Sequence, residues 1–364
     1  MSEPKGRGKP AEEIPYLPAT TSQPGIQRYL DGVCCRRGLA AVMEWLYQWE
    51  LKVGYISEEK LLDNERHTFK DPETGIDFRL QLNLARSRYT PAPESFQFLP
   101  PLHCVICREN VGRPGKENLR VFDFLLAGEP YFLQLTPFPL FTHHFVLITA
   151  EPRPQNVSPV AVSRMFQFLS LVPEYTVCSN SDVKWAGSSI LEHQHFQVFK
   201  ALHLPVMDAS VVSSIGWKRG QTRVDILDYP IAVMRVHGPG EAGVQRMGSA
   251  LIETWKMLDP GRNTVNLVLR RGEGSSSFYV FLRNPDFRTP AALQHIKSEG
   301  VGVIEAAGEI ILPVPKEEST LRRIRVAGLD VIRGILEGNN PVKGNKRDQL
   351  EEVVGSALKG LKGL

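Results

Sequence analysis

The stretch His193-Gln194-His195-Phe196-Gln197 decides the fold prediction for this chain of 364 residues. In an extended strand, successive side chains point to opposite faces, so His193, His195 and Gln197 would share one face. Phe196 would then point into an apolar core on the other side. A helix would place the two histidines on nearly opposite sides, and the local aromatic and β-branched residues favour a strand. The motif therefore predicts a strand with one polar, reactive face.

The composition predicts a soluble globular protein without a strong electric field. Hydrophobic residues make up 42% of the chain, and 43 Lys and Arg stand against 40 Asp and Glu, for a net charge of +3. This balance favours neither nucleic acid nor a membrane as partner. The amino terminus lacks the apolar stretch of a signal peptide, and the five cysteines are an odd number that fits a reducing compartment. We therefore expect a cytoplasmic protein.

Hydrophobic periodicity predicts two α+β halves around the motif. Ser158-Pro159 has the residue types of a helix N-cap and first turn. The elements expected in the first half are a helix over 37–53, strands over 121–126, 131–135, 145–149 and 175–178, and a helix after position 159. Those expected in the second half are strands over 228–236, 263–271, 276–283 and 308–313, and helices over 247–258 and 321–336.

The polar face of the motif has the chemistry needed for attack on phosphorus. A neutral imidazole, with an ordinary pKa of about 6.5, needs no separate base, and the Gln197 amide can donate to developing phosphoryl oxygens. The small, polar loop before the motif contains Asn180, Ser188 and Ser189, which are candidates for substrate binding. Ordinary turn chemistry is the alternative interpretation of that loop.

The chain resembles the transferase branch of the histidine triad superfamily, which includes galactose-1-phosphate uridylyltransferase, diadenosine tetraphosphate phosphorylase and the GDP-hexose phosphorylases. Its His-x-His-x-Gln strand carries the resemblance, and Phe196 in the fourth place looks most like the GDP-hexose phosphorylases. Segments 137–155, 227–231, 263–267 and 303–312 are also similar, so the resemblance covers roughly residues 95–336. It implies an α+β fold of two antiparallel half-barrel-type sheet units with packed helices, either fused in one chain or forming a homodimer.

The resemblance also implies a division of the chain and roles for single residues. His195 matches the family nucleophile that forms a covalent nucleotidyl-histidine, and Gln197 matches the residue that contacts the transferred phosphoryl group. The first histidine, His193, is the least specific of the three catalytic candidates. We expect a disordered tail over 1–25, a helical N-terminal extension over 26–94, a catalytic half over 95–210, a second half over 211–338, and a C-terminal tail over 339–364 that is a weak surface helix or frayed.

The same resemblance suggests a structural zinc site, although the expected reaction requires no cofactor. In the uridylyltransferase the matching first histidine joins a Cys-x-x-Cys pair, and Cys104-Val-Ile-Cys107 offers such a pair here. Two buried, reduced thiols without metal are the alternative. A fourth ligand would have to come from His144, His103 or another donor, because Glu151-Pro152-Arg153 stands where the uridylyltransferase has a further histidine.

These observations predict a nucleotidyltransferase of the phosphorylase type that acts on a nucleotide sugar, with phosphate or a sugar phosphate as acceptor. The alternative substrate is a diadenosine polyphosphate, although Ile190-Leu191-Glu192 replaces the polar residue and proline that precede the motif in the uridylyl and adenylyl enzymes. A nucleotide-binding protein without turnover and a purely structural zinc protein are the two non-enzymatic alternatives.

Overall fold

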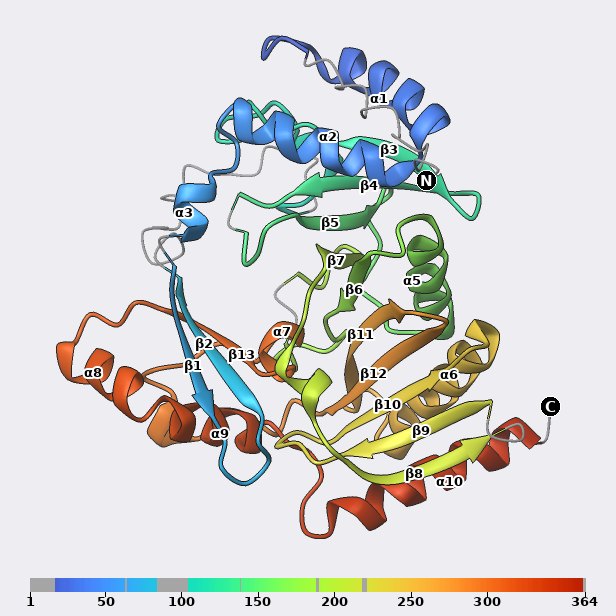
Figure 1. The fold of residues 1–364 in the computed structure, drawn as a ribbon, viewed down its shortest axis with the longest axis vertical. Coiled ribbons are helices and arrows are strands. Elements are labelled where there is room, and N and C mark those ends of the chain that lie inside the picture. Colours follow the sequence, from blue (N-terminus) through green and yellow to red (C-terminus); the bar gives the residue numbers. More distant parts are fainter. Residues whose placement is uncertain are drawn as a thin grey trace, which may run out of the picture.

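The computed structural model describes residues 17–62, 64–83, 104–137, 139–187, 190–217 and 221–362. Within these ranges the strands form one sheet of ten strands and one of three, with helices packed around both (Figure 1). No helix in this part of the chain combines the length and the apolar character needed to cross a membrane.

The helices fall into an N-terminal group, one long helix in each half, and a C-terminal group. Their bounds are α1 Gln23–Arg37, α2 Leu39–Lys52, α3 Glu58–Leu62, α5 Pro159–Leu171, α6 Glu241–Leu258, α7 Val303–Ala306, α8 Glu318–Val326, α9 Gly328–Gly338 and α10 Lys346–Lys362. Short 3₁₀ turns are η1 Arg108–Asn110, η2 Pro205–Asp208 and η3 Ala291–Leu293.

The strands are mostly five to seven residues long. Those of the small sheet are β1 Glu65–Lys70, β2 Asp77–Asn83 and β13 Glu309–Pro313. Those of the large sheet are β3 Phe122–Leu126, β4 Glu129–Leu135, β5 His144–Thr149, β6 Tyr175–Ser179, β7 His195–Lys200, β8 Val211–Trp217, β9 Thr222–Leu227, β10 Val233–Gly238, β11 Thr264–Gly272 and β12 Ser275–Arg283.

The large sheet consists of two five-stranded units with the same strand order. The first is β3-β4-β5-β7-β6 and the second is β8-β9-β10-β12-β11. In each unit one long helix, α5 or α6, follows the third strand in the chain. The units meet where β6 pairs antiparallel with β11, with Cys178 opposite Val268. The predicted α+β fold of two antiparallel half-barrel-type units is thus confirmed.

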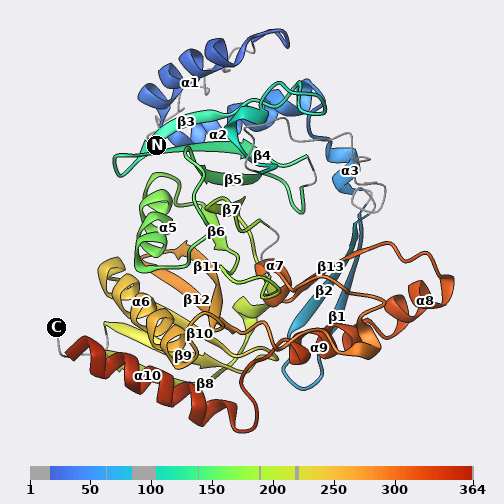
Figure 2. The same ribbon diagram turned by 180° about the vertical axis from the view of Figure 1, so that it is seen from behind.

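The main apolar core lies on the helix-covered face of the large sheet (Figure 2). Phe196 and Val198 of the motif strand point into it, as the alternation predicted, and Leu169 of α5 and Leu251 of α6 meet them there. Helix α5 begins as predicted, because the Ser158 hydroxyl caps it by accepting the Ala161 backbone N–H at 3.4 Å. The opposite face of the sheet carries a second apolar cluster, which includes Phe199 and Phe281, beside the polar side chains of the motif.

Helix α1 covers the free edge of β3 with two glutamine side chains. The Gln23 amide donates to Val121 O at 2.8 Å and accepts from Val121 N at 3.0 Å. One helical turn later, Gln27 makes the same pair of bonds with Asp123, at 2.8 and 2.9 Å. The two amides therefore take the place of a neighbouring strand and satisfy the backbone of an edge that would otherwise be open.

Helix α10 is an integral part of the main core. Leu350, Val353, Val354 and Ala357 are buried against the sheet and α6. The prediction of a weak surface helix or frayed tail over 339–364 is therefore wrong. These four apolar residues recur at helical spacing and form one buried stripe. The lysines and glutamates between these positions are typical of a surface helix, which is why the prediction placed the segment at the surface.

The N-terminal extension contains a hairpin as well as helices. Strands β1 and β2 lie within the segment 26–94 that was expected to be helical, and β13 pairs with β2 in parallel. Their partner comes from more than 200 residues away in the sequence, which local periodicity cannot indicate. The expected helix over 321–336 is split at Ala327 into α8 and α9. The domain boundaries proposed above remain predictions.

Candidate active site

The motif strand presents His195 and Gln197 on the face opposite the main core. Phe196 and Val198 alternate with them and are fully buried in that core. Strand β7 begins at His195, and His193 lies in the bend before it. The motif is thus a strand at its second histidine, while its first histidine is held by the preceding turn.

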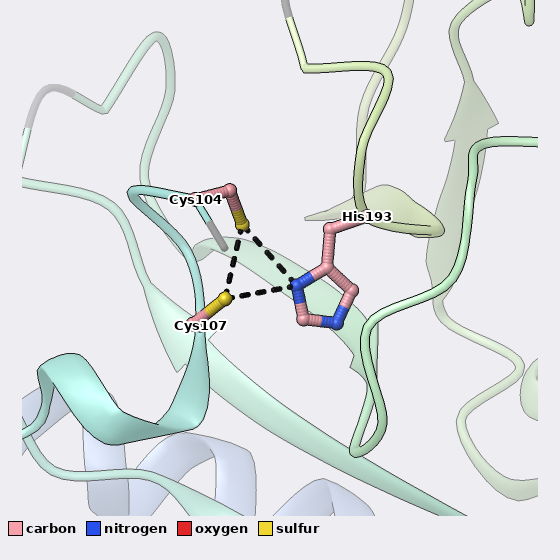
Figure 3. Close-up of side chains that lie close together, drawn as sticks. All are labelled: Cys104, Cys107 and His193. Atoms are coloured by element: carbon pink, nitrogen blue, oxygen red, sulfur yellow. Dashed lines mark hydrogen bonds between the residues drawn. The ribbon is translucent and has the colours of Figure 1, made fainter. Parts of the chain in front are cut away.

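His193 points its ring at the paired thiols of Cys104 and Cys107 (Figure 3). Its Nε2 lies 2.8 Å from Thr149 O. Because a carbonyl oxygen only accepts, Nε2 must carry the proton in the neutral ring, which leaves Nδ1 with a lone pair. That Nδ1 lies 3.3 Å from Cys104 Sγ and 3.6 Å from Cys107 Sγ, and the two sulfur atoms are 3.3 Å apart. Three donor atoms therefore converge.

This buried cluster fits a soft divalent metal such as zinc. The ligand atoms of Cys104, Cys107 and His193 all lie within 4.8 Å of one another. Thiolate and imidazole are the ligands that structural zinc prefers, and the Thr149 carbonyl fixes the ring tautomer that a metal-binding histidine needs. Burial, together with the neighbouring Cys107, raises the pKa of the Cys104 thiol to about 12. A metal cation would therefore have to displace a proton on binding.

The candidates for a fourth ligand do not join this cluster in the described part of the chain. His144 lies at the start of β5, where its Nδ1 accepts the Leu140 backbone N–H at 3.2 Å and its ring stacks on Phe199. It is thus engaged elsewhere. His103 lies outside the described residues.

His195 is held so that its Nε2 is the free nitrogen. Its Nδ1 lies 2.8 Å from His193 O, so Nδ1 donates and Nε2 keeps the lone pair in the neutral ring. Burial lowers the pKa of His195, since the charged ring would lose its hydration, and this outweighs the hydrogen bond to the His193 carbonyl, which raises it. The ring is therefore neutral at pH 7. An oriented, unprotonated imidazole nitrogen is what nucleophilic attack on phosphorus requires.

A glutamine that the sequence analysis did not assign to the site anchors the backbone of the motif. Gln155 Oε1 accepts the His195 backbone N–H at 3.0 Å, and its Nε2 lies 3.3 Å from Ser179 Oγ and 3.4 Å from Asn180 O. This side chain is buried and joins the end of β6 to the start of β7. Its place directly after Pro154, outside any regular element, gave no signal of this role.

Gln197 has a side-chain atom without a hydrogen-bond partner on the same face of the strand as His195. The residue is half-buried, and its Oε1 is buried without a hydrogen-bond partner. A buried amide atom left unpaired costs free energy, so such an atom marks a place where a ligand or water completes the site. It lies one strand repeat from His195, as the motif predicted.

The loop before the motif is fixed from two sides. Asn180 Oδ1 accepts the Val303 backbone N–H at 2.9 Å, so this side chain, which is predicted to bind substrate, holds the start of α7. Gly187 has φ +108°, and a Cβ there would lie 2.3 Å from Val301 O. The loop therefore packs tightly on the segment before α7. The other two predicted ligands, Ser188 and Ser189, lie outside the described residues.

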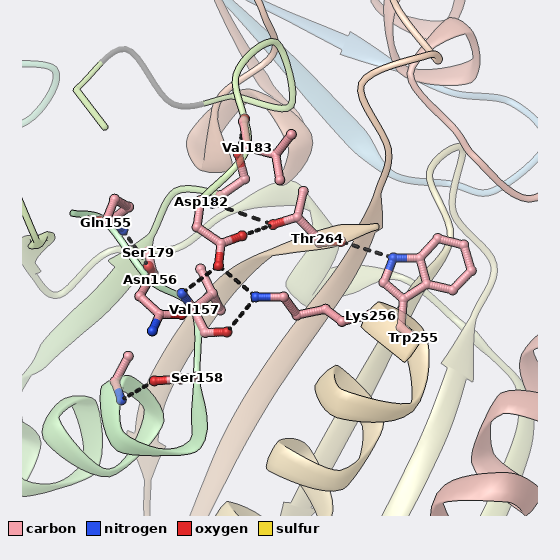
Figure 4. Close-up of polar contacts among 12 residues, drawn as sticks. Gln155, Asn156, Val157, Ser158, Ser179, Asp182, Val183, Trp255, Lys256 and Thr264 are labelled. Atoms are coloured by element: carbon pink, nitrogen blue, oxygen red, sulfur yellow. Dashed lines mark hydrogen bonds and ion pairs between the residues drawn. The ribbon is translucent and has the colours of Figure 1, made fainter. Parts of the chain in front are cut away.

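An ion pair and its hydrogen bonds tie this loop to both halves of the chain (Figure 4). Asp182 Oδ2 accepts the Val157 backbone N–H at 2.9 Å and the Lys256 ammonium at 2.6 Å. Its Oδ1 accepts the Thr264 hydroxyl at 2.6 Å. The carboxylate thus connects the approach to α5 with α6 and β11, at the junction of the two sheet units.

Comparison with known proteins agrees with this geometry. Residues 49–200 match a family model described as a domain of unknown function, DUF4922. The chain is 28% identical over 301 residues to galactose-1-phosphate uridylyltransferase of Bacillus subtilis, covering 73% of this chain and 58% of that protein. The enzyme of the same name from Caldanaerobacter subterraneus is 24% identical, with 87% and 68% covered. The chain thus spans about 58% of the length of the first of these relatives.

The fold is similar to that of the yeast Ap4A phosphorylase Apa2 in complex with AMP. That crystal structure matches with a TM-score of 0.55 and 16% identity, over 83% of this chain and 96% of that one. The ten-stranded sheet of two like units and the His-x-His-x-Gln strand agree with the sequence relationship. The sequence and fold comparisons support the resemblance of this chain to the transferase branch of the histidine triad superfamily.

Proposed function

We propose that this protein is a nucleotidyltransferase of the phosphorylase type that works through a covalent nucleotidyl-histidine at His195. The observation that carries this proposal is the orientation of the ring, whose Nδ1 donates to His193 O and leaves Nε2 unprotonated. The proposed enzymatic activity also has support from the uridylyltransferase relatives, which are 28% and 24% identical to this chain.

The reaction would proceed by two displacements at the same phosphorus atom. The Nε2 lone pair attacks the α-phosphorus of the substrate, and the bond from that phosphorus to the bridging oxygen breaks. The leaving phosphate keeps the electron pair. An oxygen of inorganic phosphate or of a sugar phosphate then attacks the α-phosphorus, the P–N bond breaks, and its electrons return to Nε2. Gln197 is proposed to donate to the transferred phosphoryl oxygens.

The proposed metal has a supporting role. Cys104, Cys107 and His193 would hold zinc, which when bound supplies a cross-link and no redox or Lewis-acid step. His193 in turn offers its carbonyl to His195 Nδ1 at 2.8 Å. A metal that fixes His193 would therefore also fix the tautomer of the proposed nucleophile, His195. In this way the thiol pair would influence the proposed reaction through His193.

The substrate that the motif favours is a nucleotide sugar, with GDP-hexose as the first candidate because of Phe196 in the motif. Phosphorolysis of a diadenosine polyphosphate is the second candidate, favoured by the likeness of segment 137–155 to those phosphorylases and by the shared fold. A nucleotide-binding protein without turnover would keep the pocket and lack the reaction.

A substrate panel separates these alternatives. The purified protein is incubated with phosphate and, in separate reactions, GDP-, UDP- and ADP-hexoses and Ap4A, and the products are identified by chromatography. Release of GDP from GDP-hexose supports the first candidate, and release of ADP with ATP from Ap4A supports the second. Tight binding of these nucleotides without any product from any member of the panel would contradict the proposed activity.

A further inference from the structure

The second sheet unit has its own equivalent of the row that holds His195. His144, the first residue of β5, lies opposite Phe199 of β7, and Val233, the first residue of β10, lies opposite Phe281 of β12. Four residues further along each strand, Ile148 faces His195. The counterpart of that pair is His237 facing Ser277.

This equivalent row is rich in cationic and hydroxyl groups. Ser277 of β12 lies between Arg270 of β11 and His237 of β10, and His237 lies opposite Arg223 of β9. Four adjacent strands thus contribute Arg, Ser, His and Arg in register. Phe278, which adjoins Ser277, points into the main core, so the row lies on the same face of the sheet as His195.

Carboxylates balance only part of this charge. In the next row Asp225, 3% exposed, accepts from Arg235 at 2.6 Å and lies 2.9 Å from His237 Nε2. Arg223 instead donates to the Ser214 hydroxyl, at 2.8 and 3.0 Å, and Arg270 contacts the neutral Met207 sulfur at 3.1 Å. Among the described residues neither of these two guanidinium groups forms an ion pair with a carboxylate.

One further acidic group lies near the row. Asp208, at the end of η2, is paired with His203 at 2.8 Å. Three guanidinium groups therefore face one buried carboxylate and this half-exposed, already paired one. The row is open to solvent, since Arg223 is exposed and Arg270, Ser277 and His237 are half-buried.

We propose that this row, Arg223, His237, Ser277 and Arg270, is a non-catalytic site for a phosphate group of a small molecule. Guanidinium forks and a hydroxyl are the donors that bind phosphate best. Ser277 stands where His195 stands in the first unit, so the second unit has no imidazole at the position of the proposed nucleophile. The site therefore binds the group without transferring it.

The test compares two substitutions of Ser277 by side chains that are similar in size to each other but differ in charge. Ser277→Asp places a negative charge between Arg270 and His237, and Ser277→Asn places a neutral amide there. Each variant and the wild-type protein are titrated by calorimetry with inorganic phosphate and, separately, with adenosine monophosphate. Arg28→Gln, on the exposed side of α1 at the other end of the molecule, is the control for loss of one arginine charge.

We expect two classes of phosphate site in the wild-type protein and in the Ser277→Asn and Arg28→Gln variants. In Ser277→Asp one class should weaken by about tenfold or more, because a carboxylate repels the ligand in the row. A larger loss for the mononucleotide identifies a nucleotide ligand, and a larger loss for inorganic phosphate identifies the free ion. If Ser277→Asp does not fold, Arg270→Gln provides the same comparison. Equal binding by wild type and variants with both probes would overturn the proposal.

Discussion

At the residue scale, the site depends on two histidine tautomers that are fixed by backbone carbonyls. Thr149 O accepts a hydrogen bond from the protonated Nε2 of His193, and His193 O accepts one from the protonated Nδ1 of His195. The first bond leaves a lone pair facing the thiols, and the second leaves a lone pair on the proposed nucleophile. The proposed ligand role of His193 and the proposed nucleophile role of His195 therefore depend on two backbone carbonyls, those of Thr149 and of His193 itself.

The metal site makes a direct prediction. The wild-type protein should contain about one zinc per chain by elemental mass spectrometry, because two thiols and an imidazole converge there. Cys104→Ser should reduce this content by more than half and lower the melting temperature, whereas Cys178→Ser, at a buried thiol outside the cluster, should leave the zinc content unchanged. Equal zinc in the wild-type and Cys104→Ser proteins would show that the pair is not a metal site.

The Gln155 side chain leads to a prediction on stability and rate. Gln155→Ala leaves the His195 backbone N–H without its acceptor and removes one of two donors to the Asn180 carbonyl, at a cost of about 1–3 kcal/mol in the free energy of unfolding. Urea denaturation measures that cost. Gln155→Glu keeps the acceptor for His195 and should recover more of the transfer rate than of the stability. Equal rates for both variants would argue against a positioning role.

At the scale of elements, the two edge strands of the large sheet differ in what covers their backbone. Strand β3 is covered by the Gln23 and Gln27 amides of α1. At the other edge β8 has no such cover from helix amides within the described residues, although the Ser213 hydroxyl donates to Glu351 of α10 at 2.6 Å. An uncovered strand edge is a template for association.

Removing the glutamine cover should therefore change the association state. We expect Gln23→Ala/Gln27→Ala to lose four hydrogen bonds to the backbone of Val121 and Asp123 and about 1–3 kcal/mol of stability, and to associate as its concentration rises. Light scattering against concentration detects this, with Arg28→Ala on the same helix as the control. A double variant with the scattering profile of the wild-type protein would show that the helix does not protect the edge.

The elements also show what the sequence could predict. The motif strand, the Ser158 cap of α5 and the strands β11 and β12 were predicted because each has a strong local pattern. The hairpin of β1 and β2 was missed, since its place depends on a partner strand far along the chain. The role of Gln155 was missed for a related reason: a glutamine in an irregular segment acquires its function only from tertiary contacts.

At the scale of the whole molecule, the two sheet units form one continuous sheet but have different side chains in equivalent rows. The first unit has the histidine motif, and the second has arginine and serine in the equivalent row. Asp182 links the units through Lys256 and Thr264, beside the loop that leads to the motif. The junction therefore supports both the fold and the site.

Breaking this junction should destabilise the whole chain. Asp182→Ala removes the acceptor for Val157 N, Lys256 and Thr264, and we expect a loss of about 2 kcal/mol, because Lys256 is partly exposed and its pairing is screened. Thermal unfolding should show one transition at a lower temperature. Glu253→Ala, on an exposed position of α6, is the control. A separate early transition of one half would instead show that the units unfold independently.

The most direct test of the central claim is mass spectrometry of the protein after incubation with GDP-hexose, other nucleotide sugars or Ap4A in the absence of phosphate. We expect an acid-labile mass increase of one nucleoside monophosphate on the peptide that contains His195, which disappears when phosphate is added. His195→Ala should show no increase, whereas His203→Ala, at an exposed histidine outside the site, should match the wild type. An adduct on another residue, or no adduct with any of these substrates, would contradict the account.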